Sequence, residues 1–201
     1  MEKARVEAFS DGVFAIVITL LILDIRLPEV HYSGLLRALI HILPRIFAYV
    51  MSFITIGLYW VSHHNSSQPI RKTDRAFLWL NILLLLFVSF LPFPTSLLGR
   101  YPFRALPIMI YGANLLTCNM IGFLMLLYIK YHPHLAVPNF EEKYFRPQVP
   151  IYIGVNGLYL FAIVIAPFIP ALSYFIYGAV VFSLIAFLIK WDFIKVATPI
   201  G

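Results

Sequence analysis

The side chains of this sequence that could do chemistry lie mostly at the ends of long apolar runs. Asp11 precedes the apolar run 12–23, in which Thr19 is the one polar side chain. The polar groups that could reach Asp11 from two later apolar runs are Trp60, His63, His64 and Asn81. Such a set suits either a structural hydrogen-bond network or a proton relay that uses the histidines. The residue types favour the network, in which Arg5 is a further candidate partner for Asp11.

A metal centre and a catalytic centre receive little support from the same residues. His63 and His64 are adjacent, and neighbouring helical residues point about 100° apart, which is poor geometry for chelating one ion. No Cys or Glu lies nearby at ligand spacing. Ser10 and Asp11 beside the histidines are the nearest approach to a hydrolase constellation. We therefore expect no catalytic residue, no metal and no cofactor.

The composition indicates an integral membrane protein embedded in a lipid bilayer. Hydrophobic residues make up 61% of the chain and charged residues only 12%, about half the charged share of a soluble domain. Basic loops on one side of a membrane explain the net charge of +6, so no nucleic-acid partner is implied. Lys3 and Arg5 precede the first apolar run as in a signal peptide, but no small-residue cleavage site follows. We expect a retained first helix.

The apolar runs predict an all-α protein with six membrane-spanning helices in a single domain, residues 1–201. The expected spans are 8–25, 39–61, 76–98, 106–129, 151–168 and 171–189. The twelve residues 12–23 would cover only about 18 Å, short of a hydrocarbon core of about 30 Å. The first helix must therefore carry Asp11, Asp24 or both toward membrane depth. Residues 131–150 form the one sizeable loop.

The Lys/Arg distribution predicts that both chain ends are cytoplasmic. One side holds ten basic residues: Lys3, Arg5, Arg71, Lys72, Arg75, Lys130, Lys143, Arg146, Lys190 and Lys195. The other side holds four, Arg26, Arg37, Arg100 and Arg104. Asp24 then lies at the outer end of the first helix, as a cation-attracting group or an ordinary interfacial acid. Arg45 either reaches outward or pairs with Asp24.

Helical phase separates two faces of the first span. At 100° per residue, Leu20 and Leu23 fall within about 40° of Ile16, and Thr19 borders them. Asp11 lies about 140° away from Ile16. Periodicity alone favours lipid or a neighbouring helix as the contact of the apolar face.

Three motifs resemble the endosomal and lysosomal potassium channel family (transmembrane protein 175 and its prokaryotic six-helix relatives). They are Arg5-x-x-x-Phe9-Ser10-Asp11 with Thr19-Leu20-Leu21, Tyr59-Trp60-x-x-His63-His64, and Leu80-Asn81 with Phe90-Leu91-Pro92-Phe93-Pro94-Thr95. The resemblance covers the first three spans well, and the later spans match mainly in number and length.

The resemblance implies a homotetramer in which the first helix of each subunit lines a central pore. Ile16, Leu20 and Leu23 would form the constriction, Thr19 would act in selectivity, and Asp24 would lie at the outer mouth. The structural network would comprise Arg5, Phe9, Ser10, Asp11, Trp60, His63, His64 and Asn81.

The function implied is a passive cation channel with modest potassium selectivity in the cell membrane, and not an enzyme. A hydrophobic constriction of this kind can also act as a gate by dewetting. Potassium would be the permeant ion, other monovalent cations are further candidates, and no small-molecule substrate is expected. The alternative is a proton-coupled transporter of a small solute or ion that uses Asp11, His63 and His64.

Overall fold

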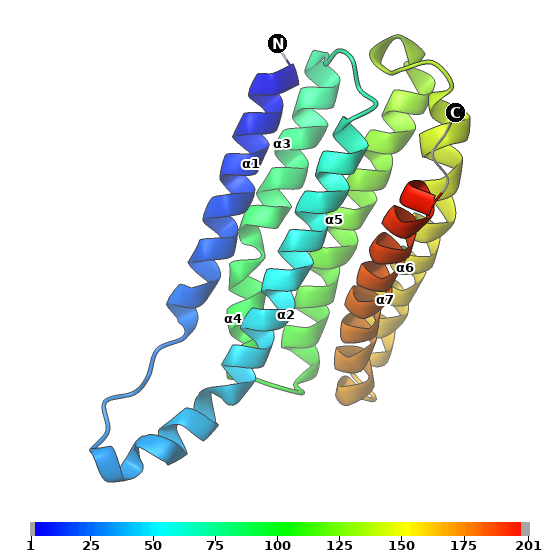
Figure 1. The fold of residues 1–201 in the computed structure, drawn as a ribbon. Coiled ribbons are helices and arrows are strands. Elements are labelled where there is room, and N and C mark those ends of the chain that lie inside the picture. The colour runs from blue at the N-terminus through cyan, green and yellow to red at the C-terminus, as the bar shows by residue number, and fades with distance from the viewer. Residues whose placement is uncertain (1–2, 198–201) are drawn as a thin grey trace.

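The chain folds into a bundle of long helices (Figure 1). The structure is a computed structural model that describes residues 3–197, with side chains as far as residue 187. Over this part of the chain, six helical segments are long and apolar enough to cross a membrane, as the sequence predicts. They are Lys3–Asp24, Tyr32–Ser67, Arg75–Arg100, Ala105–Tyr131, Glu141–Ile165 and Pro170–Phe187.

The elements follow one another with short connections. In chain order they are α1 (Lys3–Leu20), η1 (Leu21–Asp24), η2 (Tyr32–Gly34), α2 (Leu35–Ser67), α3 (Arg75–Phe90), α4 (Pro92–Arg100), α5 (Ala105–Tyr131), η3 (Pro133–Leu135), η4 (Glu141–Phe145), α6 (Arg146–Ile165) and α7 (Pro170–Ala197).

The first span reaches across a membrane only because it includes its acids. α1 and η1 together contain 22 residues, which corresponds to about 33 Å of helix. Asp11 lies inside this length and Asp24 is its last residue. The helix leaves regular geometry at Ile25, whose backbone is extended.

Two predicted boundaries differ from the structure. The third span is two helices, because Pro92 lacks an amide proton and the chain turns at Leu91, whose amide donates to the Val88 carbonyl. The predicted loop 131–150 is wrong in its second half. A π-helical turn begins at Glu141 and continues directly into α6, where an early proline is tolerated.

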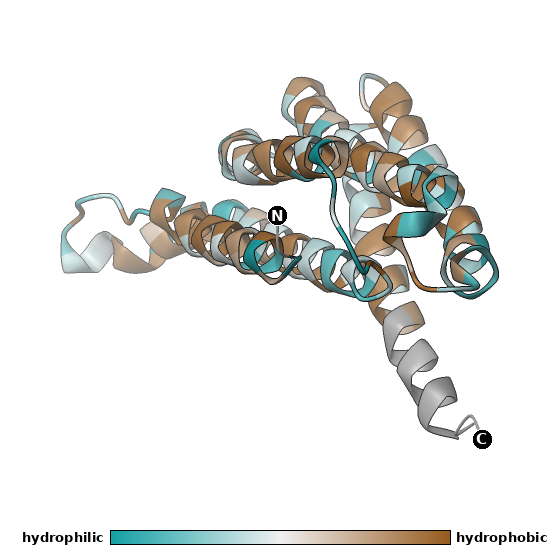
Figure 2. Ribbon diagram, turned by 90° about the horizontal axis from the view of Figure 1, so that it is seen from above, coloured by the Kyte–Doolittle hydropathy of each residue, from teal (hydrophilic) through white to brown (hydrophobic). Residues whose placement is uncertain are grey.

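The core forms around α5, which packs against α3, α4, α6 and α7, whereas α1 packs mainly against α2 and α3 at the edge of the bundle (Figure 1). Figure 2 looks along the bundle from the end that carries the α2–α3 loop, where hydrophilic residues gather in the loops. At this end the α2–α3 loop is hydrogen bonded to the α5–α6 connection. The Arg71 amide donates to the Leu135 carbonyl at 2.7 Å, and the Val137 amide donates to the Pro69 carbonyl at 2.9 Å.

Candidate functional site

The first helix has one buried face and one exposed apolar face. Val6, Ser10, Phe14, Val17 and Leu21 are buried against the bundle at helical spacing. Ile16, Leu20 and Leu23 lie on the opposite side and are 60%, 45% and 61% exposed. Among the described residues, none covers the apolar face that helical phase predicts.

Thr19 is exposed beside this apolar face and is satisfied within its own helix. Its hydroxyl lies 2.8 Å from the carbonyl oxygen of Ile16 and 3.1 Å from that of Ala15, and it donates back to them. The donor is thus occupied by the backbone. The oxygen lone pairs of Thr19 still point away from the helix and can accept from water or contact a cation.

A directional hydrogen-bond chain joins α2, α3 and α1. The Asn81 amide nitrogen donates to the Ser10 hydroxyl at 3.0 Å, and that hydroxyl donates to the Val6 carbonyl at 2.9 Å. The Asn81 carbonyl oxygen lies 2.8 Å from Nε2 of His63. Because this oxygen can only accept, His63 carries its proton on Nε2 and donates. Asn81 and Ser10 are fully buried, so each group depends on its partner.

Asp11 has a different partner at the same end of the bundle. The indole Nε1–H of Trp60 donates to the Asp11 carboxylate at 2.8 Å, and the Trp60 ring stacks on His64 at a centroid distance of 6.0 Å. Asp11 is exposed apart from this contact. The acid of the first helix is therefore held by an aromatic donor on α2.

Arg5 and Phe9 are exposed, and Arg5 forms no ion pair with Asp11 in the described part of the chain. Their membership of the network stays a prediction.

A second contact between α1 and α2 was not anticipated from the sequence. The Ser67 hydroxyl donates to the Glu7 carboxylate at 2.8 Å, and Lys3 lies 3.5 Å from the same oxygen. Glu7 precedes Asp11 by one helical turn and faces the same neighbouring helix. That spacing is the sequence signal that could have identified it.

At the other end of the first helix, Asp24 is paired. Its carboxylate lies 2.8 Å from a guanidinium nitrogen of Arg100 and accepts a 2.8 Å hydrogen bond from the Ser96 hydroxyl. Of the two roles considered for Arg45, the pairing with Asp24 is not observed. Arg45 instead lies against Gly99 of α4, where an added Cβ would come within 2.9 Å of the Arg45 Cα.

The described residues contain no group of three or more His, Cys, Asp or Glu side chains that could hold a metal ion. The polar groups of the site are thus arranged as helix-to-helix hydrogen bonds, and the exposed part of the site is an apolar helix face with one hydroxyl.

The amino-acid sequence is similar to a known family over its first half. The sequence profile of the family described as endosomal/lysosomal potassium channel TMEM175 matches residues 5–92. A potassium channel of Chryseobacterium sp. strain P1-3 is 41% identical over 116 residues, which cover 58% of this chain and 59% of that protein. The human endosomal/lysosomal proton channel TMEM175 is 47% identical over 114 residues, which cover 51% of this chain and 23% of the human protein. The matched region spans about half the length of the bacterial curated relatives or slightly more.

The fold is similar to a solved structure over almost its whole length. The crystal structure of a lysosomal potassium-selective channel TMEM175 homolog from Chamaesiphon minutus superposes with a TM-score of 0.81 at 33% sequence identity. The superposition covers 92% of this chain and 97% of that chain.

Proposed function

The chain belongs to the endosomal/lysosomal potassium channel TMEM175 family, and we propose that four copies of it form a passive potassium channel lined by α1. It is a multi-pass membrane protein, and we place it in the cell membrane. The family is one of ion channels and not of enzymes, so the catalytic interpretation of Ser10 and Asp11 is set aside. Membership of a channel family does not favour the proton-coupled transporter either.

One observation carries the proposal: α1 is held by its polar face and leaves an apolar face uncovered. The Trp60–Asp11 and Asn81–Ser10 contacts fix the helix against α2 and α3. Ile16, about one and a half turns further along α1, remains 60% exposed. Four such helices around an axis would bring their exposed faces together as stacked apolar rings.

The permeation mechanism follows from this apolar neck. An ion that passes rings of Ile16, Leu20 and Leu23 must give up part of its hydration, because these side chains offer no ligand in return. Potassium is larger than sodium and surrenders its water at lower cost. The neck therefore favours potassium only modestly, and it can close by dewetting.

Thr19 would supply the polar group nearest the neck. Its donor is engaged by the Ile16 and Ala15 carbonyls, so an oxygen lone pair is the part left for a passing cation. We propose that this partial replacement of water adds to the preference for potassium.

The names of the relatives disagree about the ion that passes through the channel. The bacterial relatives are named potassium channels, whereas the human relative is named a proton channel. We propose potassium, because the solved structure that matches nearly the whole chain is described as potassium-selective.

The test is ion-substitution flux in liposomes with matched variants. Ile16→Asn is expected to wet the neck, raising flux or lowering the discrimination between potassium and sodium. Ile153→Asn on α6 is the control, because Ile153 is 62% exposed and outside the proposed pore. Leu20→Asn and Leu158→Asn form a second pair, since both leucines are 45% exposed.

Unchanged flux in both α1 variants, or equal changes in the controls, would refute the pore assignment. A mass measurement of the reconstituted oligomer tests the tetramer separately. A pH-sensitive dye inside the same liposomes reports whether protons are carried instead of potassium.

A further inference from the structure

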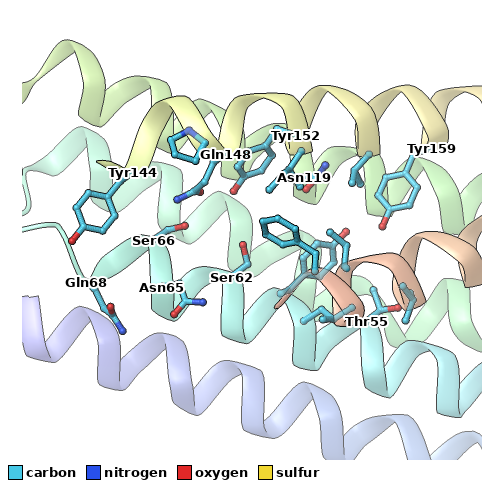
Figure 3. A pocket seen from close by; sticks show the side chains of 18 of the residues that line it. Thr55, Ser62, Asn65, Ser66, Gln68, Asn119, Tyr144, Gln148, Tyr152 and Tyr159 are labelled. Atoms are coloured by element: carbon cyan, nitrogen blue, oxygen red, sulfur yellow. The ribbon is translucent and has the colours of Figure 1, made fainter. Parts of the chain in front are cut away.

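A cavity lies between the helices of the bundle, away from α1. Its volume is about 600 Å³, and it is enclosed by α2, α5, η4, α6 and α7 (Figure 3). No residue of α1 lines it. Neither the proposed pore nor the anchoring network of α1, the Trp60–Asp11 and Asn81–Ser10 contacts, involves this cavity. The cavity therefore has a separate role.

The cavity has its most polar end toward the loops, and apolar wall appears toward the middle of the bundle. At the end nearest the α2–α3 loop, its lining includes Ser66, Gln68, Tyr144 and Gln148 (Figure 3). Further along the helices, the apolar wall is formed by Leu58, Val155, Val181 and Leu184, which alternate with the polar side chains of Thr55, Asn119 and Tyr159 (Figure 3). A molecule that fits both ends must carry a hydrogen-bonding head and an apolar body.

The length of the cavity suits such a molecule. Thr55 and Gln68 mark its extent along α2, and thirteen residues of helix correspond to about 20 Å. This distance accommodates a lipid headgroup together with the first part of an acyl chain.

The charge of the lining indicates which kind of hydrogen-bonding head the bound molecule has. Among the described residues that line the cavity, Lys143 is the only charged side chain and none is an acid. Lys143 is exposed at the polar end, where its ammonium group lies 5.7 Å from the Tyr144 ring. Hydroxyl and amide donors beside a lysine favour an anionic group that accepts hydrogen bonds.

The position of the polar end points to a membrane lipid. Lys3 donates to the Gln68 carbonyl at 3.4 Å, so the cavity opens at the same end of the bundle as the basic residues of the N-terminus and the α2–α3 loop. Clusters of basic residues at a membrane surface attract anionic lipids, and pockets between spanning helices at that surface bind their headgroups.

We propose that this cavity binds an anionic phospholipid from the leaflet next to these basic loops. The phosphate lies between Lys143 and the hydroxyl and amide groups of α2 and α6, and one acyl chain follows the apolar wall.

The bound lipid would contact the helix that anchors α1. Ser62 and Ser66 line the cavity from α2, and Tyr152 lines it from α6 (Figure 3). On the same turns, Trp60 lies about 160° around α2 from Ser62 and holds α1, and His63, the neighbour of Ser62, contacts Asn81 of α3. The lipid therefore packs against the back of the anchoring network.

The test is native mass spectrometry of the purified full chain with phosphatidylglycerol and phosphatidylcholine of identical acyl chains. The wild-type protein is expected to retain phosphatidylglycerol at least about fivefold more strongly, the effect of one lysine near a membrane surface. Lys143→Gln should remove about that factor. Lys72→Gln, an exposed lysine outside the cavity, should leave it unchanged.

Filling the cavity gives an independent variant. Ser62→Trp should lower the retention of both lipids by more than tenfold, while Lys143→Gln lowers only the preference for phosphatidylglycerol. Equal retention of the two lipids by the wild type would overturn the proposal, as would Lys143→Gln behaving like Lys72→Gln. The measurement uses no ion flux, so its result is independent of whether the channel proposal holds.

Discussion

Arg100 of α4 lies 2.8 Å from the carboxylate of Asp24 at the end of η1. The pair joins the last residue of the first span to the helix that follows the proline break at Leu91. It also places the positive charge of Arg100 beside Asp24, the acid proposed to lie at the outer mouth of the pore. The ion pair therefore opposes the attraction of cations by Asp24 and holds the end of the helix in place.

Removing this positive charge is expected to increase cation entry. In Arg100→Gln, Asp24 keeps its charge without a counter-ion. A unit charge about 10 Å from an ion in water contributes roughly 0.4 kcal/mol, or about a twofold rise in local cation concentration per subunit. Potassium conductance in planar bilayers should rise at low ionic strength and return to the wild-type value at about 1 M salt, where the charge is screened.

The matched control for this prediction is Arg104→Gln. Arg104 is an exposed arginine in the same connection and forms no ion pair in the described structure. Its conductance should follow the wild type at both salt concentrations. An increase in Arg100→Gln that persists in high salt would show a change of pore shape and contradict the electrostatic explanation.

The buried amide of Asn81 is predicted to stabilise the junction of the first three spans. Asn81→Leu leaves the part-buried His63 Nε2–H without its acceptor and the buried Ser10 oxygen without the donor from Asn81. The expected loss is about 1–3 kcal/mol of stability, measured as a lower melting temperature of the purified protein. Asn65→Leu, an exposed amide on α2, is the control, and an equal loss there would contradict the prediction.

The Asp11–Trp60 hydrogen bond separates a structural role of the acid from a pH-sensing role. A double-mutant cycle with Asp11→Ala and Trp60→Phe should give a coupling energy of about 1 kcal/mol, since the acid is exposed on one side. If Asp11 is structural, the folded fraction of the Asp11→Ala protein should show the same pH dependence of ion flux as the wild type. A well-folded Asp11→Ala protein with altered pH dependence would favour the sensor or the proton relay.

Much of the architecture could be predicted from the sequence because lipid imposes simple rules. Long apolar runs must be helices, so the six spans follow from composition. Polar groups inside such runs must find partners, which is why Asp11, Asn81 and His63 could be identified before their contacts were visible. Helical phase also separated Ile16 from Asp11, and the structure places the two on different sides of α1.

The remaining features depend on tertiary geometry that sequence spacing does not encode. Arg100 reaches Asp24 because the chain turns at Leu91 and redirects α4, whereas the sequence had suggested Arg45 as the candidate partner. Residues 141–145 resemble a polar loop in the sequence but form a helical turn. Glu141 there pairs with Lys130 of α5 at 3.2 Å.

The pH dependence of stability is predicted to involve Asp74, which caps α3 outside the membrane spans. Burial disfavours its charge, but hydrogen bonds from the Tyr128 hydroxyl at 2.6 Å and the Phe77 amide at 2.8 Å outweigh this and lower the pKa of the Asp74 carboxyl. A lowered folded-state pKa gives stability that is fully present above the unfolded value of about 3.9. This stability is lost as the pH falls through the folded-state pKa.

Tyr128→Phe removes one of the contacts that lower this pKa, so it should be less stable than the wild type at pH 7. Because Asp74 is then closer to its unfolded pKa, the variant also has less stability to lose in acid. The difference in melting temperature between the two proteins should therefore narrow from pH 5 to about pH 3. Tyr131→Phe, an exposed tyrosine at the end of the same helix, should match the wild type throughout. A difference in melting temperature between Tyr128→Phe and the wild type that stays constant with pH would show that Tyr128 acts by packing alone.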